Sequence, residues 1–429
     1  MSPPLEIQPS GPLNARIRPP GSKSITNRAL ICAALADGES RLAGALDSED
    51  TRLMAAALRD LGVEIDGPAD ELRVAGCGGR FPASAADLFV GNSGTTVRFL
   101  AAVVALAQGR FRLDGTRRMR ERPIQDLLDG LKQLGANARS ETDSGCPPLV
   151  VDAAGLPGGR AAVRGDVSSQ FLSGLLLAAP YARRPVELKI EGPLVSQPYV
   201  RMTLAVMQFF GVAVETDAAL SRFHVPSGQR YAARRYAIEP DASAASYFFA
   251  AAAIAGGEMT VEGLSKDSLQ GDVAFVDVLR KMGCEVRHEA DGIAVVGGRP
   301  LRGVDVDMNA ISDTVQTLAA VALFAEGPTT VRGVAHIRHK ETDRIAALAT
   351  ELRKLGAAVE ERADGLRITP APLRGCALDT YDDHRMAMSL ALVGLRLPGV
   401  VINDPGCTAK TYPRFFDDLA AVCGRASGA

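Results

Sequence analysis

Short polar segments recur along the chain, and several of them carry lysine, arginine or acidic side chains that could bind anions and transfer protons. Four of them carry cationic side chains, and the last two carry acidic ones as well: Gly21-Ser-Lys-Ser-Ile-Thr-Asn-Arg28, Gly91-Asn-Ser-Gly-Thr-Thr-Val-Arg98, Lys340-Glu-Thr-Asp-Arg344 and Asp383-His-Arg-Met386. Lysine and arginine bind phosphate and carboxylate through charge-assisted hydrogen bonds. Aspartate, glutamate, lysine and histidine transfer protons once a closed site adjusts their pKa values. The sequence therefore indicates a site for small anions with proton-transferring groups beside it.

Each polar segment runs into an Ala/Leu-rich stretch that is typical of a buried helix, such as 99–107 and 244–256. The pattern recurs about every 70 residues, which is the mark of an internal repeat. The six segments begin at Gly21, Gly91, Asp166, Asp241, Asn309 and Asp382.

A second repeated feature is an amphipathic helix that ends on glycine and is followed by an alternating strand. In the helix before Gly356, the apolar residues Ile345, Leu348, Leu352 and Leu355 form one stripe. Glycine is the usual residue just after a helix end. The closing glycines are Gly62, Gly135, Gly211, Gly283, Gly356 and Gly424. The chain is thus predicted to contain six α/β units, which could form a ring, a solenoid or two domains of three. Its length favours two domains.

Composition excludes several classes of protein. Among 429 residues, 48 basic and 50 acidic side chains nearly cancel, which argues against a nucleic-acid protein that relies on a positive field. Seven scattered cysteines without a CxxC pair favour a reducing compartment and argue against a zinc site. No signal peptide and no apolar run of about 20 residues is visible. We expect a cytoplasmic protein that binds neither membrane nor nucleic acid and acts as a monomer.

A polar helix start can bind an anion through its unpaired N–H groups, but ordinary N-capping explains any single one. Lysine and arginine residues stand beside several of these helix starts, and their presence favours anion binding over simple capping. A nucleotide P-loop is a weak alternative, because Lys23 follows Ser22 and Ile17 stands where the upstream glycine is required. No HExxH or acidic cluster with metal-ligand spacing is present, so we expect no metal and no cofactor.

The four segments named above resemble the signatures of the 5-enolpyruvylshikimate-3-phosphate (EPSP) synthase family, in the same order along nearly the whole chain. The related UDP-N-acetylglucosamine enolpyruvyl transferases usually carry a cysteine in the loop that corresponds to 117–122, where this chain has none.

The resemblance implies an α/β, two-domain enolpyruvyl transferase fold, an inside-out α/β barrel of six βαβαββ repeats with three in each domain. It implies an N-terminal lobe of residues 20–238 and a C-terminal lobe of 1–19 plus 239–429, with the active site in the cleft between them. The crossings would lie near Pro19-Pro20 and Ile238-Glu239-Pro240, where proline stiffens the backbone.

The resemblance also implies the substrates and the residues that bind them. The family transfers the enolpyruvyl group of phosphoenolpyruvate to shikimate 3-phosphate, a step toward chorismate and the aromatic amino acids, and is the target of glyphosate. The residues matched to shikimate 3-phosphate are Lys23, Ser24, Arg28, Ser168, Ser169, Gln170, Ser196, Tyr199, Asp313, His336 and Lys340. Those matched to phosphoenolpyruvate are Lys23, Asn92, Gly94, Arg122, Gln170, Arg344, Arg385 and Lys410.

Two positions depart from the family pattern. His336 stands where the family often has asparagine, and Phe99 stands where many members have proline. We expect the first to affect a substrate contact and the second to affect the helix beside Gly94.

The implied chemistry is an addition followed by an elimination, so it needs a base, an acid and anion-binding cations. Asp313 is the expected base and Glu341 the expected proton donor, with Lys23 and His384 as possible helpers. The simpler interpretations are that Asp313 caps a helix and that Glu341 is a first-turn helix acid. Two alternative functions remain, a sugar-nucleotide enolpyruvyl transferase and a non-catalytic phosphate-binding module.

Overall fold

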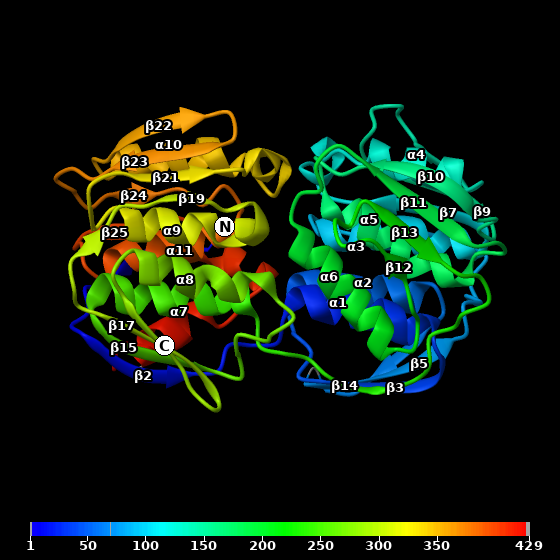
Figure 1. Ribbon diagram of the computed structural model, residues 1–429, viewed down its shortest axis with the longest axis horizontal. Helices are drawn as coiled ribbons and strands as arrows, with labels where there is room; N and C mark the ends of the chain where they lie inside the picture. The colour runs from blue at the N-terminus through cyan, green and yellow to red at the C-terminus, as the bar shows by residue number, and fades with distance from the viewer. Residues whose placement is uncertain (1, 69, 426–429) are drawn as a thin grey trace. The chain divides into compact units, whose positions relative to one another are not determined.

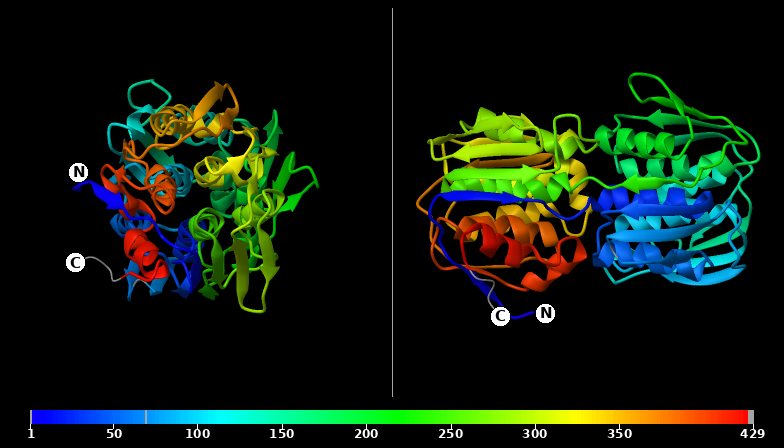
Figure 2. Two further views of the ribbon diagram at one scale, coloured as in Figure 1. Left: turned by 90° about the vertical axis from the view of Figure 1, so that its left-hand side faces the viewer. Right: turned by 90° about the horizontal axis from the view of Figure 1, so that it is seen from below.

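Two units, each built around a hydrophobic core of its own, make up the chain in the computed structural model, which describes residues 2–68 and 70–425. The N-terminal unit comprises Gly21–Ile238. The C-terminal unit joins the segment that ends at Pro20 to the chain from Glu239 onward. The blue N-terminal strands and the red C-terminal helix therefore belong to the same unit (Figures 1 and 2).

One βαβαββ unit is seen in full between residues 85 and 154. Its first strand is parallel to its second. The last strand of the following hairpin pairs antiparallel with the second strand, and the first strand of the hairpin pairs antiparallel with that last strand at the sheet edge. The sheet order is β6-β7-β9-β8. The elements are β6 (Ala85–Phe89), α3 (Gly94–Val103), β7 (Gln108–Asp114), α4 (Gln125–Gln133), β8 (Asn137–Ser140) and β9 (Leu149–Ala154).

Two further copies complete the N-terminal unit. The copy in residues 23–77 takes its first strand from the far end of the unit, where β14 (Arg235–Ala237) pairs parallel to β3. Its other elements are α1 (Lys23–Leu35), β3 (Asp37–Ala43), α2 (Glu49–Asp60), β4 (Glu64–Asp66) and β5 (Glu71–Cys77). The other copy consists of β10 (Gly159–Arg164), α5 (Ser169–Ala178), β11 (Val186–Glu191), α6 (Gln197–Phe209), β12 (Glu215–Thr216) and β13 (Arg222–Val225).

The C-terminal unit repeats the design, and it uses the N-terminal segment twice. β2 (Leu13–Ile17) pairs parallel to β15, and β1 (Leu5–Ile7) pairs antiparallel to β25. The fourth copy continues with α7 (Ala242–Ala255), β15 (Gly257–Glu262), α8 (Phe275–Lys281), β16 (Glu285–His288) and β17 (Gly292–Gly297). The fifth consists of β19 (Asp305–Asp307), α9 (Val315–Ala322), β21 (Thr329–Arg332), α10 (Arg344–Lys354), β22 (Ala358–Arg362) and β23 (Gly365–Thr369). The sixth contains β24 (Ala377–Leu378), α11 (His384–Gly394), β25 (Val400–Ile402) and α12 (Phe415–Val422), and a small sheet pairs β18 (Leu301–Arg302) with β20 (Ala325–Glu326).

The prediction of six α/β units is confirmed, with one correction to the sixth. A strand was expected after every closing glycine, but within the described residues none follows Gly424. The third strand of that sheet is β1, which comes from the other end of the chain.

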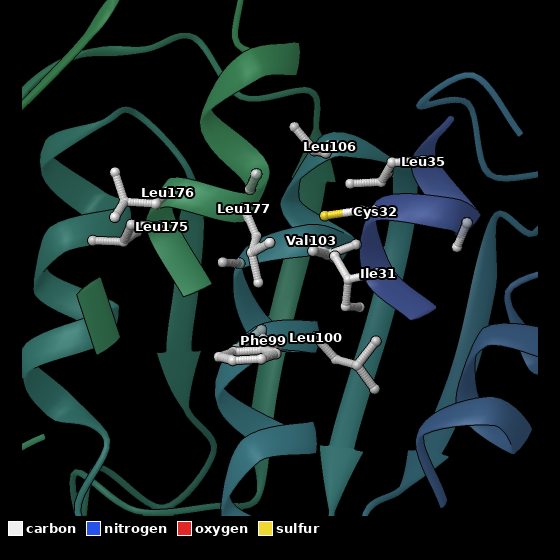
Figure 3. Packing of buried hydrophobic residues seen from close by; sticks show 14 of the residues in the cluster. Ile31, Cys32, Leu35, Phe99, Leu100, Val103, Leu106, Leu175, Leu176 and Leu177 are labelled. Atoms are coloured by element: carbon white, nitrogen blue, oxygen red, sulfur yellow. The ribbon is translucent and has the colours of Figure 1, made fainter. Parts of the chain in front are cut away.

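The Ala/Leu-rich helices form the interior of each unit, as their all-round apolar sequences predict. α1, α3 and α5 pack together in the N-terminal unit, and α7, α9 and α11 do so in the C-terminal unit. Figure 3 shows the first group, in which Ile31, Leu100 and Leu177 come from three different helices and share one core. Small side chains allow helix backbones to approach closely, so the three inner helices of each unit can pack against one another.

The outer helices end as the sequence predicts. All six closing glycines have positive φ, from 71° at Gly424 to 111° at Gly283. A side chain in this left-handed conformation is strained, whereas glycine is not. The predicted stripe of α10 is also confirmed, because Ile345, Leu348 and Leu352 are fully buried. Among the described residues, no helix is both long enough and apolar enough to span a bilayer.

Candidate functional site

The inner helices begin with the polar caps that the sequence predicts in five of the six units. In each of the five, the cap side chain accepts a hydrogen bond from a backbone N–H of the first turn, which leaves the other first-turn N–H groups at a positive helix end. The capping residues are Ser22, Ser93, Ser168, Asp241 and Asp383.

The fifth unit is different, and the simple interpretation of Asp313 as a helix cap is wrong. The segment Asn309–Thr314 forms a 3-10 turn that is interrupted at Ile311, where φ is −129°. α9 then starts after Thr314 without a side-chain cap bond. The carboxylate of Asp313 is thus available to cations of neighbouring elements.

Three cations surround the carboxylate of Asp313 within the C-terminal unit. Arg385 Nη2 lies 2.8 Å from Oδ2, and Arg344 Nη1 lies 3.3 Å from Oδ1. Lys340 Nζ lies 3.6 Å from Oδ1. These cations come from the turn before α10 and from the first turns of α10 and α11, so three segments meet at one carboxylate.

Arg344 connects this carboxylate to two others. Its guanidinium is fully buried and lies 2.9 Å from Glu341 Oε2 and 2.8 Å from Asp383 Oδ2. Burial alone would lower the pKa of Arg344, but the carboxylates of Asp383, Glu341 and Asp313 outweigh it and hold the pKa above its ordinary value. Glu341 precedes the N-cap Asp343, so it is not a first-turn acid of α10. The two candidate proton-transfer carboxylates, Asp313 and Glu341, therefore share one guanidinium.

The remaining candidates of the C-terminal unit are buried. His336 Nε2 lies 3.0 Å from Ser312 Oγ, and burial together with the charge of Lys340 lowers the pKa of His336 to about 3. His384, the first residue of α11, is fully buried, with Nδ1 3.8 Å from Asp383 Oδ1. Lys410 is buried at the end of a 3-10 turn, Pro405–Lys410.

In the N-terminal unit, α1 presents Lys23 and Arg28. Lys23 Nζ lies 3.5 Å from the buried carboxylate of Asp50 in α2. Arg28 is buried and donates to Thr203 Oγ1 at 2.7 Å and to the carbonyls of Ser24 and Tyr199. Within the described residues it has no carboxylate partner, and burial lowers its pKa to about 10. A buried cation held only by neutral oxygens favours an anionic ligand.

Gly94 starts α3 against two guanidinium groups. A Cβ at this position would lie 2.4 Å from Arg122 Nη2 and 2.7 Å from Arg98 Nη1, so only glycine allows this approach. Arg122 Nη1 in turn donates to the backbone carbonyl of Asn92 at 2.8 Å and to its side-chain oxygen at 3.2 Å. Asn92, Gly94 and Arg122, predicted as one set, do lie together.

Gln170, in the first turn of α5, joins this group through residues far away in sequence. Its Oε1 accepts from Arg98 Nη1 at 2.6 Å, and its Nε2 donates to Thr95 Oγ1 at 3.1 Å. Ser168 Oγ accepts from the backbone N–H of Gln170, and Ser169 is buried beside it.

Ser24 and Tyr199 contact Arg28, and Ser196 lies at the start of the helix that carries Tyr199. Ser196 caps α6 in a left-handed conformation with φ of 52°, and Tyr199 follows in the first turn. The carbonyls of Tyr199 and Ser24 hold the guanidinium of Arg28.

Phe99 does not interrupt the helix that follows Gly94. It is fully buried inside regular α3, and its ring centroid lies 5.1 Å from Arg28 Cζ. The phenyl ring thus supports the buried guanidinium by a cation–π contact.

Some residues of these networks were not assigned to a substrate from the sequence, and four of them are charged or aromatic. Asp50 contacts Lys23, Arg98 contacts Gln170, Asp383 contacts Arg344, and the Tyr247 hydroxyl lies 3.3 Å from Arg385 Nη1. Arg98 and Asp383 stand inside the polar segments, which was a usable signal. Asp50 and Tyr247 lie in ordinary helices, and nothing in their sequence context marks them.

A metal site or another hollow could also serve a function. In the described part of the chain, no group of histidine, cysteine and acidic side chains could hold a metal ion. A hollow of about 880 Å³ lies over the sheet of β10–β13, where Arg160 and Glu187 pair with each other at 2.8 Å. Its mixed charges distinguish it from the cation-rich helix starts.

Comparison with known proteins gives a consistent result. The sequence profile described as EPSP synthase (3-phosphoshikimate 1-carboxyvinyltransferase) matches residues 7–419. A 3-phosphoshikimate 1-carboxyvinyltransferase of Trichormus variabilis is 50% identical over 416 residues, which cover 96% of this chain and 97% of the relative. The chloroplastic protein of that name from Petunia hybrida is 48% identical, over 97% of this chain and 84% of its own.

A solved structure has the same fold. The EPSP synthase of Acinetobacter baumannii superposes with a TM-score of 0.81 at 27% identity, covering 98% of both chains. The full-length profile match, the identities near one half and the shared fold agree with the polar segments and the six repeated units. The chain belongs to the EPSP synthase family.

Proposed function

We propose that this protein transfers the enolpyruvyl group of phosphoenolpyruvate to the 5-hydroxyl of shikimate 3-phosphate and releases phosphate. The observation that carries the proposal is the cluster at Arg344, where Asp313 and Glu341 share one buried guanidinium beside Arg385 and Lys340. Such a cluster combines two groups able to transfer protons with cations able to hold phosphate and carboxylate. The names of the relatives support the same reaction.

The reaction would proceed by addition and elimination. In the addition, Asp313 accepts the proton of the 5-hydroxyl, the hydroxyl oxygen bonds to C2 of phosphoenolpyruvate, and Glu341 protonates C3. In the elimination, the carboxylate of Glu341 takes a proton back from C3, the bond from C2 to the phosphate oxygen breaks, and phosphate leaves with that oxygen. Lys23 and His384 are proposed as helpers. The arginines stabilise charge and fix the orientation of the substrates.

The proposed binding sets divide between the two substrates. Shikimate 3-phosphate would bind through Lys23, Ser24, Arg28, Ser168, Ser169, Gln170, Ser196, Tyr199, Asp313, His336 and Lys340. Phosphoenolpyruvate would bind through Lys23, Asn92, Gly94, Gln170, Arg122, Arg344, Arg385 and Lys410. Because both sets draw on both units, we propose that the active site forms between the N-terminal and the C-terminal unit. Free cysteines support a reducing, cytoplasmic setting, and we propose a monomer.

Phosphate release in the presence of each substrate alone and of both tests this function. Release that requires both phosphoenolpyruvate and shikimate 3-phosphate supports it. Release that requires UDP-N-acetylglucosamine as the acceptor would assign the protein to the sugar-nucleotide transferases. Phosphate binding without release under any condition would leave a non-catalytic module.

A further inference from the structure

Helix α10 holds the turn before α11 at two separate points. Arg344, its first residue, binds the carboxylate of Asp383. Glu351 lies seven residues further along, which is two helical turns, and therefore on the same side of α10. It binds the same turn a second time, through Asp379 and Tyr381, which lie five and three residues before the start of α11.

Glu351 is a buried carboxylate that lies outside the proposed substrate-binding sets. Its side chain is fully buried, and three donors satisfy it: the Tyr381 hydroxyl at 2.6 Å, the backbone N–H of Asp379 at 3.0 Å and Lys354 Nζ at 2.9 Å. Lys354 Nζ also lies 2.7 Å from Asp379 Oδ2, and Asn403 Nδ2 donates to Asp379 Oδ1 at 2.8 Å. A buried carboxylate is costly unless it is bonded in this way, so these contacts form a rigid anchor.

The turn that Glu351 holds has an unfavourable backbone. Tyr381 and Asp382 are consecutive non-glycine residues with φ of 57° and 53°. Side chains rarely adopt this left-handed conformation, and it persists only where the surroundings impose it. Tyr381 is 40% exposed, so little core packing holds it, and the hydrogen bond of its hydroxyl to Glu351 ties this turn to α10.

The turn leads directly into Asp383 and Arg385, and Asp383 orients Arg344. Asp383 follows it directly, is fully buried, and accepts hydrogen bonds from Arg344 Nε at 2.8 Å and from the backbone N–H of Arg385 at 2.9 Å. Arg385 then reaches Asp313 at 2.8 Å. A change in the turn would therefore move the carboxylate that orients Arg344 and the helix start that carries Arg385.

We propose that Glu351 and Tyr381 are positioning residues, which hold the turn 379–383 so that Arg344 and Arg385 present one fixed binding site for phosphoenolpyruvate. The inference rests on the proposed function. Burial and the hydrogen bond to Glu351 raise the pKa of Tyr381 to about 12, so its hydroxyl remains a donor at neutral pH.

The test compares Tyr381→Phe and Glu351→Gln with the wild-type protein. Because the phenyl ring is kept, Tyr381→Phe removes one hydroxyl and its bond. We expect the KM for phosphoenolpyruvate at saturating shikimate 3-phosphate to rise about tenfold, which corresponds to 1.4 kcal/mol. Binding of shikimate 3-phosphate alone, measured by calorimetry, should change less than about twofold. The double variant should be no worse than the more affected single variant, because the two residues act through one bond.

Tyr181→Phe is the matched control. The Tyr181 hydroxyl also anchors backbone, since it donates to the carbonyl of Leu35 and accepts from the N–H of Tyr231, but it lies in the N-terminal unit. This variant should lower thermal stability without changing either substrate constant. An unchanged KM for phosphoenolpyruvate in Tyr381→Phe, or an equal loss for both substrates, would overturn the positioning role. A wild-type protein without activity on the two substrates would instead overturn the proposed function, and this inference with it.

Discussion

Arg344 is the residue that does most to organise the candidate site. It is fully buried and contacts three carboxylates, those of Asp313, Glu341 and Asp383. Removing one member of such a buried cluster leaves an uncompensated charge, which typically costs about 3–5 kcal/mol. Substitutions that keep shape and hydrogen bonding are therefore the informative ones at this site.

Glu341→Gln should lower turnover severely while leaving substrate binding largely intact. The amide oxygen can still accept from Arg344 Nη2, which lies 2.9 Å from the carboxylate in the wild type, but the group no longer titrates. Loss of a general acid typically lowers kcat by about 10²–10⁴-fold. Steady-state kinetics measure this. Glu360→Gln, at an exposed position of β22, is the control and should be silent. Near wild-type turnover of Glu341→Gln would refute the proton-donor role.

His336→Asn should make the protein less sensitive to mild acid. The pKa of His336 falls from 6.5 to about 3 on folding, so below pH 6.5 the unfolded chain binds a proton that the folded chain excludes. This lowers stability progressively as the pH falls from about 6.5 toward 3, by about 1.4 kcal/mol at one unit below the unfolded pKa. Asparagine does not titrate, so the loss of unfolding free energy between pH 7.5 and 5.5 should shrink by about 1 kcal/mol.

Denaturant unfolding at the two pH values measures this difference. His288→Asn, at an exposed site of β16, is the matched control and should lose as much stability as the wild type between them. The same loss in His336→Asn would show that this imidazole titrates normally.

Individual residues were predictable where the sequence repeats a pattern around them. Lys23 and Arg385 stand in polar segments that recur in every unit, so their type and position carried a signal. Contacts between units of the repeat were not predictable. Arg98 meets Gln170 across 72 residues, and nothing local to either indicates the other.

At the scale of elements, the start of α3 depends on the absence of a side chain at Gly94. A methyl group there would lie 2.4 Å from Arg122 Nη2, too close for any real contact, so the guanidinium would have to move. We expect Gly94→Ala to raise the glyphosate inhibition constant by at least about tenfold and the KM for phosphoenolpyruvate by less, if both bind beside Arg122.

Gly130→Ala is the helix-glycine control for that variant. Its Cβ would touch only side-chain carbons of Leu175 and Val163, at 3.1 and 3.6 Å. Inhibition and kinetics should stay as in the wild type. A glyphosate inhibition constant that Gly94→Ala leaves unchanged would contradict the placement of the inhibitor beside Arg122.

Element types followed from sequence because each has a local cause. Glycines with positive φ end the outer helices, and serine or aspartate caps five of the inner ones. The start of α9 could not be predicted, because the break at Ile311 turns Asp313 toward cations of other segments. The pairing of β14 and β1 could not be predicted either, because each pairs with a strand near the opposite end of its unit's sequence, β14 with β3 and β1 with β25.

At the scale of the whole molecule, residues proposed to bind the same two substrates lie in both units. Cations on two separate bodies repel each other, and a bound dianion reverses the sign of that interaction. Moving an equilibrium from mostly open to mostly closed takes about 5.5 kcal/mol, which several charge-assisted bonds could supply.

Solution scattering should therefore report a smaller radius of gyration when shikimate 3-phosphate is added, and a further change with glyphosate or phosphoenolpyruvate. Arg385→Ala should weaken the second change more than the first, because Arg385 belongs to the phosphoenolpyruvate set. Identical scattering curves for the free and the doubly liganded protein would exclude closure as the way the site is assembled.

The central claim is that this protein breaks the carbon–oxygen bond of phosphoenolpyruvate in order to transfer its enolpyruvyl group. The most direct test uses phosphoenolpyruvate labelled with ¹⁸O in the oxygen that bridges C2 and phosphorus, incubated with shikimate 3-phosphate and the protein. Addition and elimination at C2 predict that the label leaves with the phosphate and that the acceptor gains an unlabelled enol ether. Mass spectrometry of both products reads this out. Phosphate without the label, or an acceptor that gains a phosphoryl group, would show cleavage at phosphorus and contradict the account.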